Sequence, residues 1–162
     1  MTMPDDAAAF SRGVEDLLSA QAFHPAMQFL AKSFVATHEA EPRMAALFAT
    51  QQRWLLSHAT LAFHFQLKLW GQPGLTRRDV GHLAIQHRIV SRNTAYAFFG
   101  EALQYDVIRQ IDPLETGRLI TVEPAPTTIV MLIHWYSIHF QALDMIDSGD
   151  RTARFAEGSA RI

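Results

Sequence analysis

The chain has 162 residues, of which 49% are hydrophobic and 19% are charged, and its formal net charge is −2. This balance allows a sizeable buried core and excludes a chain that is disordered by composition. There is no cysteine, which excludes disulfide bonds and thiolate metal sites. The strongly basic composition of many nucleic-acid-binding proteins is missing, so contact with DNA would need locally concentrated positive charge.

The N-terminal residues 1–12 lack the basic start and apolar run of a signal peptide, and we expect them to form a loose arm. The densest apolar stretch is Thr127–Ile146, which contains His134, His139 and Asp144. We interpret it as a buried or interface helix and not as a membrane span. Together with the absence of cysteine, these features favour a cytoplasmic protein without membrane contact.

Helices are predicted at residues 14–22, 25–37 and 44–70. Pro25 suits the first turn of the second helix, and Pro42 lies beyond its end. In the third helix, two neighbouring apolar rows with seven-residue spacing form a wide face, which we interpret as partly an intersubunit surface. The alternative is that the two earlier helices cover this face within one chain. The rows are Leu47, Trp54, Leu61 and Phe48, Leu55, Ala62, Leu69.

A helix-turn-helix is predicted after the break at residues 71–74. Thr76 and Asp79 have the spacing of a capping box at the start of its first helix. Residues 87–90 form the turn, and Ser91 is a suitable N-cap for the second helix. The buried stripes are predicted to be Val80, Leu83 and Ala84 in the first helix, and Ala95, Phe98, Phe99, Ala102 and Leu103 in the second.

The outward side of the second helix carries side chains suited to reading DNA. Arg92 can bind guanine or phosphate with two hydrogen bonds, and Asn93 can pair with adenine. Ser91 and Thr94 add hydroxyl groups beside a helix N-terminus, which attracts phosphate. The predicted outward set is Arg92, Asn93, Tyr96, Ala97 and Gly100.

Positive charge gathers around this predicted turn. Between Thr76 and Thr94 four arginines stand against the single acid Asp79, a net +3 in a chain whose total is −2. A basic patch on an otherwise acidic protein is typical of a DNA-binding surface, whereas the alternative is an ordinary solvated face. The arginines are Arg77, Arg78, Arg88 and Arg92.

Two short strands, Val107–Ile111 and Leu119–Glu123, are predicted to follow, joined by a turn at residues 112–117. Arg118 follows the turn and could reach a minor groove or a phosphate, or else be an ordinary surface arginine at a strand end.

A last helix is predicted over Ile129–Ile146, with Thr127 or Thr128 as its cap. The polar tail, residues 151–162, is expected to fray or pack loosely.

The stretches LTRRDVGHLA, SRNTAYAFFGEAL and VIRQIDPLETGRLITVEP resemble the winged helix-turn-helix regulators, most closely a MarR-like bacterial group. The resemblance implies a mainly α fold with a small β-hairpin wing. Residues 71–124 would form the DNA-binding unit, and residues 1–70 and 125–162 would supply core and dimerisation helices. The implied partners are double-stranded DNA and a second copy of the chain.

Carried over residue by residue, the resemblance places Ser91, Arg92, Asn93, Thr94 and Tyr96 in the major groove. Arg118 becomes the wing arginine, with Asp112 or Glu115 as its carboxylate partner. Two positions depart from the family pattern: Arg88 stands near the usual turn glycine, and Asp106 replaces the glycine before the wing. The turn is also one residue longer than in the family pattern, and Asp106 would adopt a left-handed backbone less easily than the usual glycine.

Other chemistry is disfavoured by the sequence. No two of the eight histidines are three or four residues apart, so no same-face helical metal pair is expected. A serine elbow, a P-loop and a dinucleotide fingerprint are also missing, and we expect neither enzyme activity nor a cofactor. Six aromatic residues could line an effector pocket, although core packing is favoured. They are Phe63, Phe65, Trp70, Trp135, Tyr136 and Phe140.

The sequence therefore predicts a homodimeric DNA-binding regulator. The alternative is a winged-helix module that binds protein and not DNA, since the fold alone does not establish DNA binding. A further hypothesis is a sensor in which an unidentified small-molecule effector changes the spacing of the two reading helices.

Overall fold

The computed structural model of the protein describes residues 13–40, 42–112 and 120–159. The chain divides into two compact units. We call residues 1–39 with 131–162 the flanking unit, and residues 40–130 the central unit. The predicted segment 1–70 therefore contributes to both units.

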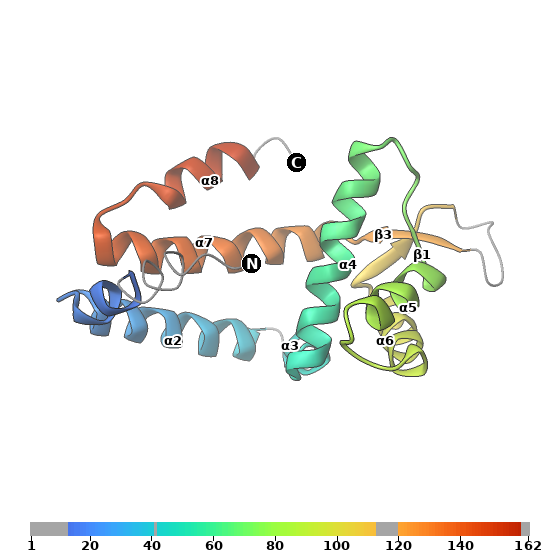
Figure 1. The fold of residues 1–162 in the computed structure, drawn as a ribbon, viewed down its shortest axis with the longest axis horizontal. Coiled ribbons are helices and arrows are strands. Elements are labelled where there is room, and N and C mark those ends of the chain that lie inside the picture. The colour runs from blue at the N-terminus through green and yellow to red at the C-terminus, as the bar shows by residue number, and fades with distance from the viewer. Residues whose placement is uncertain (1–12, 41, 113–119, 160–162) are drawn as a thin grey trace, which may run out of the picture. The chain divides into compact units, whose positions relative to one another are not determined.

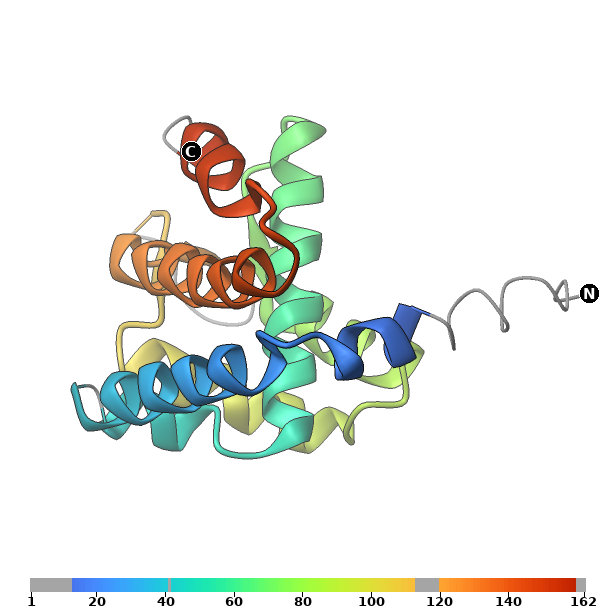
Figure 2. The same ribbon diagram turned by 90° about the vertical axis from the view of Figure 1, so that its left-hand side faces the viewer.

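The flanking unit is helical in its described part. Residues 13–19 form a short helix, followed by α2 (Phe23–Ala40), the C-terminal part of α7 (Pro126–Asp147) and α8 (Arg151–Ser159). Figures 1 and 2 show α2 and α8 on opposite sides of α7. Aromatic rings join these helices: Phe34 stacks on Trp135 with ring centroids 4.4 Å apart, and Phe155 lies 5.1 Å from Phe140.

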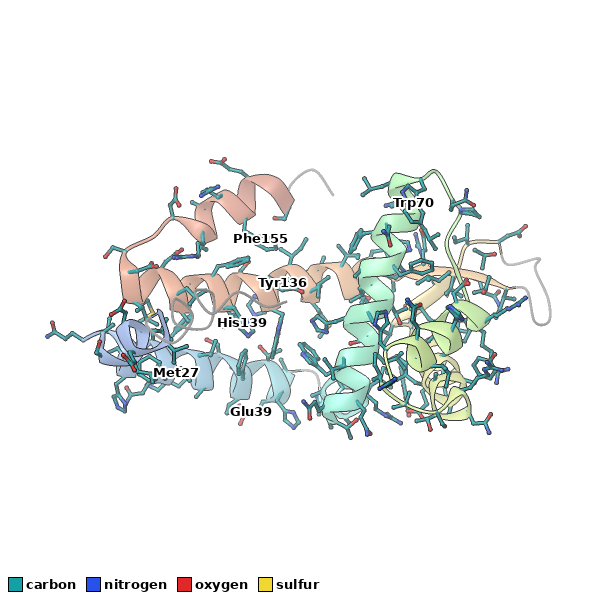
Figure 3. The ribbon with its side chains drawn as sticks, viewed as in Figure 1. Met27, Glu39, Trp70, Tyr136, His139 and Phe155 are labelled. Carbon is teal, nitrogen blue, oxygen red and sulfur yellow. The ribbon has the colours of Figure 1, made fainter. Side chains whose placement is uncertain are left out.

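The prediction of a loosely packed tail was wrong for residues 151–159. The N-terminus of α8 is held by Asp144, whose carboxylate accepts hydrogen bonds from the amides of Arg151 (3.1 Å) and Thr152 (2.8 Å). The side chain of Arg151 also forms ion pairs with Asp144 and Asp147. These contacts lie within the flanking unit, where Figure 3 shows Phe155 on α8 and Tyr136 on α7.

The central unit combines helices with a small antiparallel sheet. Its elements are α3 (Pro42–Leu47), α4 (Gln51–Leu69), β1 (Leu75–Thr76), α5 (Arg77–Gln86), α6 (Arg92–Gln104), β2 (Ile108–Gln110) and β3 (Thr121–Pro124). The strand order is β1-β3-β2, with Leu75 opposite Val122 and Ile108 opposite Pro124. Leu56, Leu75 and Val122 are fully buried between the helices and the sheet.

The long helix predicted over residues 44–70 is broken. Thr50 has an extended backbone, and its hydroxyl accepts a hydrogen bond from the amide of Arg53, which starts α4 as a new helix. Of the two apolar rows, the one with Trp54 and Leu61 is at least half-buried. In the other row Leu55, Ala62 and Leu69 are exposed, so only part of the wide face is covered.

The predicted bounds and buried stripes of α5 and α6 are confirmed. Thr76 and Asp79 form the predicted capping box, and Ser91 caps α6 by accepting a hydrogen bond from the amide of Thr94. The stripe residues on both helices are buried, except that Leu103 is half-buried. Local capping and apolar spacing were therefore sufficient to locate α5 and α6.

Two further elements differ from the predictions. Strand β1 was not predicted, because two residues are too few to show an alternating pattern. The last helix begins at Pro126, a residue suited to a first helical position. The hydroxyl of Thr128 donates to the carbonyl of Val107 at 2.7 Å and does not cap the helix.

Helix α7 has an unusual composition for a surface helix. Among the described residues it is the one helix long and apolar enough to cross a membrane, with a mean hydropathy of 1.2 in its most apolar window. Only 11% of that window is buried. Its polar residues nevertheless make contacts inside the flanking unit, where the His139 ring packs on Phe34 and Trp135 and Asp144 holds α8. The low burial speaks against a buried helix, so the alternative of an interface helix remains a prediction.

Candidate nucleic-acid interface

The first turn of α6 forms the centre of the candidate interface. Ser91, Arg92, Asn93 and Thr94 are all exposed, whereas Ala95 behind them is fully buried. The hydroxyl of Ser91 lies 2.8 Å from that of Thr94 and 3.2 Å from its amide nitrogen. The helix N-terminus and its polar side chains are thus accessible together, as predicted.

The turn between α5 and α6 contains a strained arginine. Arg88 has a φ of 52°, in the left-handed region that favours glycine. The turn is held by hydrogen bonds from the amide of His87 to the carbonyl of Leu83 (3.0 Å) and from the amide of Ile89 to the carbonyl of Ala84 (2.9 Å). Ile89 packs against the core, and the side chain of Arg88 is exposed.

The arginines of the interface differ from the others in their partners. Among the described residues, no carboxylate forms an ion pair with any of the four exposed arginines Arg77, Arg78, Arg88 and Arg92. The other arginines whose side chains are described all have such partners, namely Arg53 (Glu101), Arg109 (Glu123), Arg151 (Asp144 and Asp147) and Arg154 (Asp150).

The one acidic residue in this stretch is engaged elsewhere. The carboxylate of Asp79 accepts hydrogen bonds from the amide of Thr76 at 2.8 Å and from its hydroxyl at 2.7 Å. Asp79 therefore caps the N-terminus of α5 and forms no ion pair with the neighbouring arginines.

Tyr96 lies differently from the other predicted contact residues. It is half-buried, and Cζ of Arg77 lies 4.3 Å from the centroid of its ring. A Cβ atom added at Gly81 would lie 2.5 Å from Cε1 of Tyr96 and 3.3 Å from Cγ of Arg92. The ring thus packs between α5 and α6, and the expectation of a simply outward tyrosine was incomplete.

The predicted wing lies partly outside the described residues. Arg118 and its suggested partner Glu115 fall in the range 113–119, which the structure does not describe. Asp112 is described and exposed. The sheet instead shows a cross-strand ion pair between Arg109 and Glu123 at 2.7 Å, which the sequence analysis did not single out although the two residues lie in the predicted strands.

A cavity of about 50 Å³ lies within the central unit, between α4, α5, α6 and the sheet. None of the six aromatic residues predicted to line an effector pocket lines this cavity. Among the described residues, no group of three or more histidine, aspartate or glutamate side chains is arranged to hold a metal ion.

Comparisons with models of protein families, with curated proteins and with solved structures found no match for this chain. The resemblance to MarR-like regulators therefore remains a prediction from the sequence. The function is best argued from the position of the unpaired arginines and the order of the elements around them.

Proposed function

We propose that this chain is a cytoplasmic, DNA-binding transcriptional regulator that acts as a homodimer on a pseudo-palindromic duplex site. In this proposal α6 enters the major groove with its N-terminal turn. The two α6 helices of the dimer enter successive major grooves about 34 Å apart. The chain needs neither a cofactor nor enzyme activity for this function.

The order of the elements supports a winged helix-turn-helix. Helix α4 is followed by β1, the helix pair α5 and α6, and the strands β2 and β3. Because β3 pairs with both β1 and β2, the strand pair after α6 is anchored beside the two helices. The segment joining β2 and β3 would be the wing, and α6 would be the reading helix.

The observation that carries the proposal is the group of four exposed arginines without carboxylate partners at the start of α5, in the following turn and at the start of α6. The two other exposed arginines with described side chains, Arg109 and Arg154, do have carboxylate partners. A DNA backbone supplies the missing negative charge, and binding releases its counterions. The backbone amides at the start of α6 add donors that can bind one of these phosphates.

The interface residues divide into two roles. Arg77, Arg78 and Arg88 are proposed to bind phosphates, which sets affinity and register. Arg92 and Asn93 are proposed to contact base edges, which sets the preferred sequence. Ser91 and Thr94 would contribute hydroxyl contacts at the same helix end.

An apolar surface on the flanking unit supports the homodimer. Large apolar side chains are exposed along residues 13–19, α2 and α7. Exposed large apolar side chains that gather in a patch commonly mark a protein–protein interface. A second copy is the expected partner, since two reading helices are needed for a pseudo-palindromic site. The exposed residues are Val14, Leu18, Met27, Val35, Tyr136, Leu143 and Met145.

The test begins with selection of bound sequences from random duplex DNA, followed by anisotropy titrations between about 50 and 200 mM salt. We expect affinity to fall steeply with salt. Arg92→Ala should weaken binding to the selected site by about 1–3 kcal/mol and reduce discrimination at one base pair. The matched control is Arg109→Ala, which removes an exposed arginine that is paired with Glu123. Equal affinity and selectivity for Arg92→Ala and wild type would refute the proposal.

The exposed end of α4 favours the second candidate, a winged-helix module that binds protein. Leu69 is 86% exposed and Trp70 is 61% exposed, and Figure 3 shows Trp70 at this helix end. Exposed tryptophan is a frequent anchor of protein interfaces. Selection that yields no duplex, together with partner binding that is insensitive to salt and lost in Trp70→Ala, would favour this candidate.

A further inference from the structure

A notch at Gly81 of α5, where there is no side chain, accepts a side chain of α6. Gly81 is buried in the middle of α5, where glycine costs about 1 kcal/mol relative to alanine. Any larger residue at position 81 would clash with the Tyr96 ring, because an added Cβ would lie 2.5 Å from Cε1 and 3.2 Å from Cζ of Tyr96. The Tyr96 ring therefore packs directly against the α5 backbone at Gly81.

Two residue pairs meet at this notch, one from α5 and one from α6. On α5, Arg77 lies four residues before Gly81, and on α6, Arg92 lies four residues before Tyr96, so each pair shares a helix face. The guanidinium of Arg77 lies over the Tyr96 ring, with its Cζ 4.3 Å from the ring centroid. The stem of Arg92 passes the same notch, with its Cγ 3.3 Å from the position a Cβ would take at residue 81.

We propose that Tyr96 is a positioning residue that acts through Arg77, and that Gly81 makes this possible. This inference rests on the proposed function, and it replaces a direct groove contact by Tyr96. An exposed arginine loses rotamer freedom when it binds a phosphate. Since the ring already holds the guanidinium in the free protein, less freedom is lost on binding. The half-buried position of Tyr96 suits this indirect role.

A double-mutant cycle tests the proposal by titration of the selected duplex. We expect Tyr96→Leu to weaken binding about two- to fivefold, the size of an exposed cation–π contact. Tyr96→Phe should retain wild-type affinity, because the ring is kept. In the Arg77→Ala background, Tyr96→Leu should have no further effect, because its partner is gone. Tyr105→Leu is the matched control, since Tyr105 is the exposed C-cap of the same helix.

The outcomes are distinguishable. If Tyr96→Phe loses as much affinity as Tyr96→Leu, the hydroxyl contacts DNA directly and the positioning role is overturned. Additive effects of Tyr96→Leu and Arg77→Ala overturn it as well. A wild-type protein that binds no duplex overturns the proposed function together with this inference.

A measurement without DNA covers the case in which Tyr96→Leu does not fold. In the wild-type protein, the side-chain protons of Arg77 should show an upfield ring-current shift in NMR spectra. The neighbouring Arg78, which is exposed and has no ring partner among the described residues, should not. The absence of a shift at Arg77 would overturn the inference.

Discussion

At the scale of single residues, three described residues other than glycine have a left-handed backbone: Ser148, with a φ of 55°, and two residues that flank α6. Arg88 in the turn has a φ of 52°, and Asp106 after α6 has a φ of 54°. Such a conformation costs a residue with a Cβ about 1–2 kcal/mol. The cost at Arg88 is understandable if its charge is needed at the interface, because glycine would supply the backbone geometry without the guanidinium.

Substitution by glycine at these two positions should separate stability from function. Arg88→Gly is expected to raise the free energy of unfolding by about 0.5–1 kcal/mol and yet to weaken duplex binding. Asp106→Gly should give a similar stabilisation without weaker binding. Thermal unfolding and anisotropy titrations of both variants provide the comparison. A loss of stability in Arg88→Gly would contradict the strain argument.

His64 is a buried polar residue in the central unit. It is 4% exposed, and its Nδ1 has no hydrogen-bond partner among the described residues. Burial lowers the pKa of His64 below its ordinary value of 6.5, and nearby Lys68 lowers it further, against an opposing effect of Glu123. His64 is therefore neutral near pH 7, as a charge in this position would be costly.

Acidification should consequently destabilise the central unit. The unfolded chain takes up a proton at His64 near its ordinary pKa, whereas the folded chain resists it, so stability is full above about pH 7 and falls below pH 6.5. His64→Leu should flatten the dependence of thermal unfolding on pH between about 7 and 5. The control is His82→Gln, which changes an exposed histidine of α5. If the pH dependence of thermal unfolding is the same in His64→Leu as in the wild type, protonation of His64 is not its cause.

At the scale of elements, the position of α8 depends on the carboxylate of Asp144 in α7. Asp144 binds the first amides of α8 as well as the hydroxyl of Thr152 (2.8 Å). Burial alone would raise the pKa of Asp144, but the hydrogen bonds from Thr152 and Arg151 outweigh this and lower it to about 2. The carboxylate therefore stays charged and holds α8 well into the acid range.

Asp144→Asn should release α8 while α7 remains helical. We expect faster amide hydrogen exchange over residues 151–159, because an amide side chain cannot replace the charged acceptor. In the wild-type protein the same release should occur only as the pH falls from about 4 towards 2, since a lowered pKa stabilises the folded state above that range. Asp150→Asn is the control, as its contact with Arg154 is long (3.9 Å) and exposed. Unchanged exchange in Asp144→Asn would show that the ring contacts of Phe155 suffice.

At the scale of the whole molecule, the apolar side chains of the flanking unit and the arginines of the central unit suit two different partners. One surface has exposed Leu18, Met27 and Val35 and would hold a second copy. The other has exposed arginines and would hold DNA. In the proposed regulator, affinity depends on both, because two weak half-site contacts become strong only when they are linked.

Sedimentation equilibrium should therefore give twice the chain mass of 18.3 kDa at micromolar concentration. Val35→Asp, which places a charge on a side chain that is 56% exposed, should shift the protein towards the monomer and weaken duplex binding together. Ala153→Asp on the exposed side of α8 should change neither property. A wild-type protein that sediments as a monomer would remove the homodimer from the proposal.

What could be predicted from the sequence depended on short-range physics. Capping at Thr76 and Ser91 and the buried stripes of α5 and α6 arise from residues within about four positions of each other. The same holds for the outward position of Arg92 and Asn93, because a helix with a known inward face has a known outward face. The basic surface was visible because its arginines lie close together in the chain.

Only the tertiary structure decided the contacts between distant segments. Strand β1 exists because β3 lies beside it, and α8 is ordered because Asp144 of α7 meets its first turn. The placement of Tyr96 depends on Gly81 of another helix, which no periodicity within α6 could reveal. Likewise, the partners of the arginines became known only in the fold, because an ion pair such as Arg53 with Glu101 joins residues far apart in the chain.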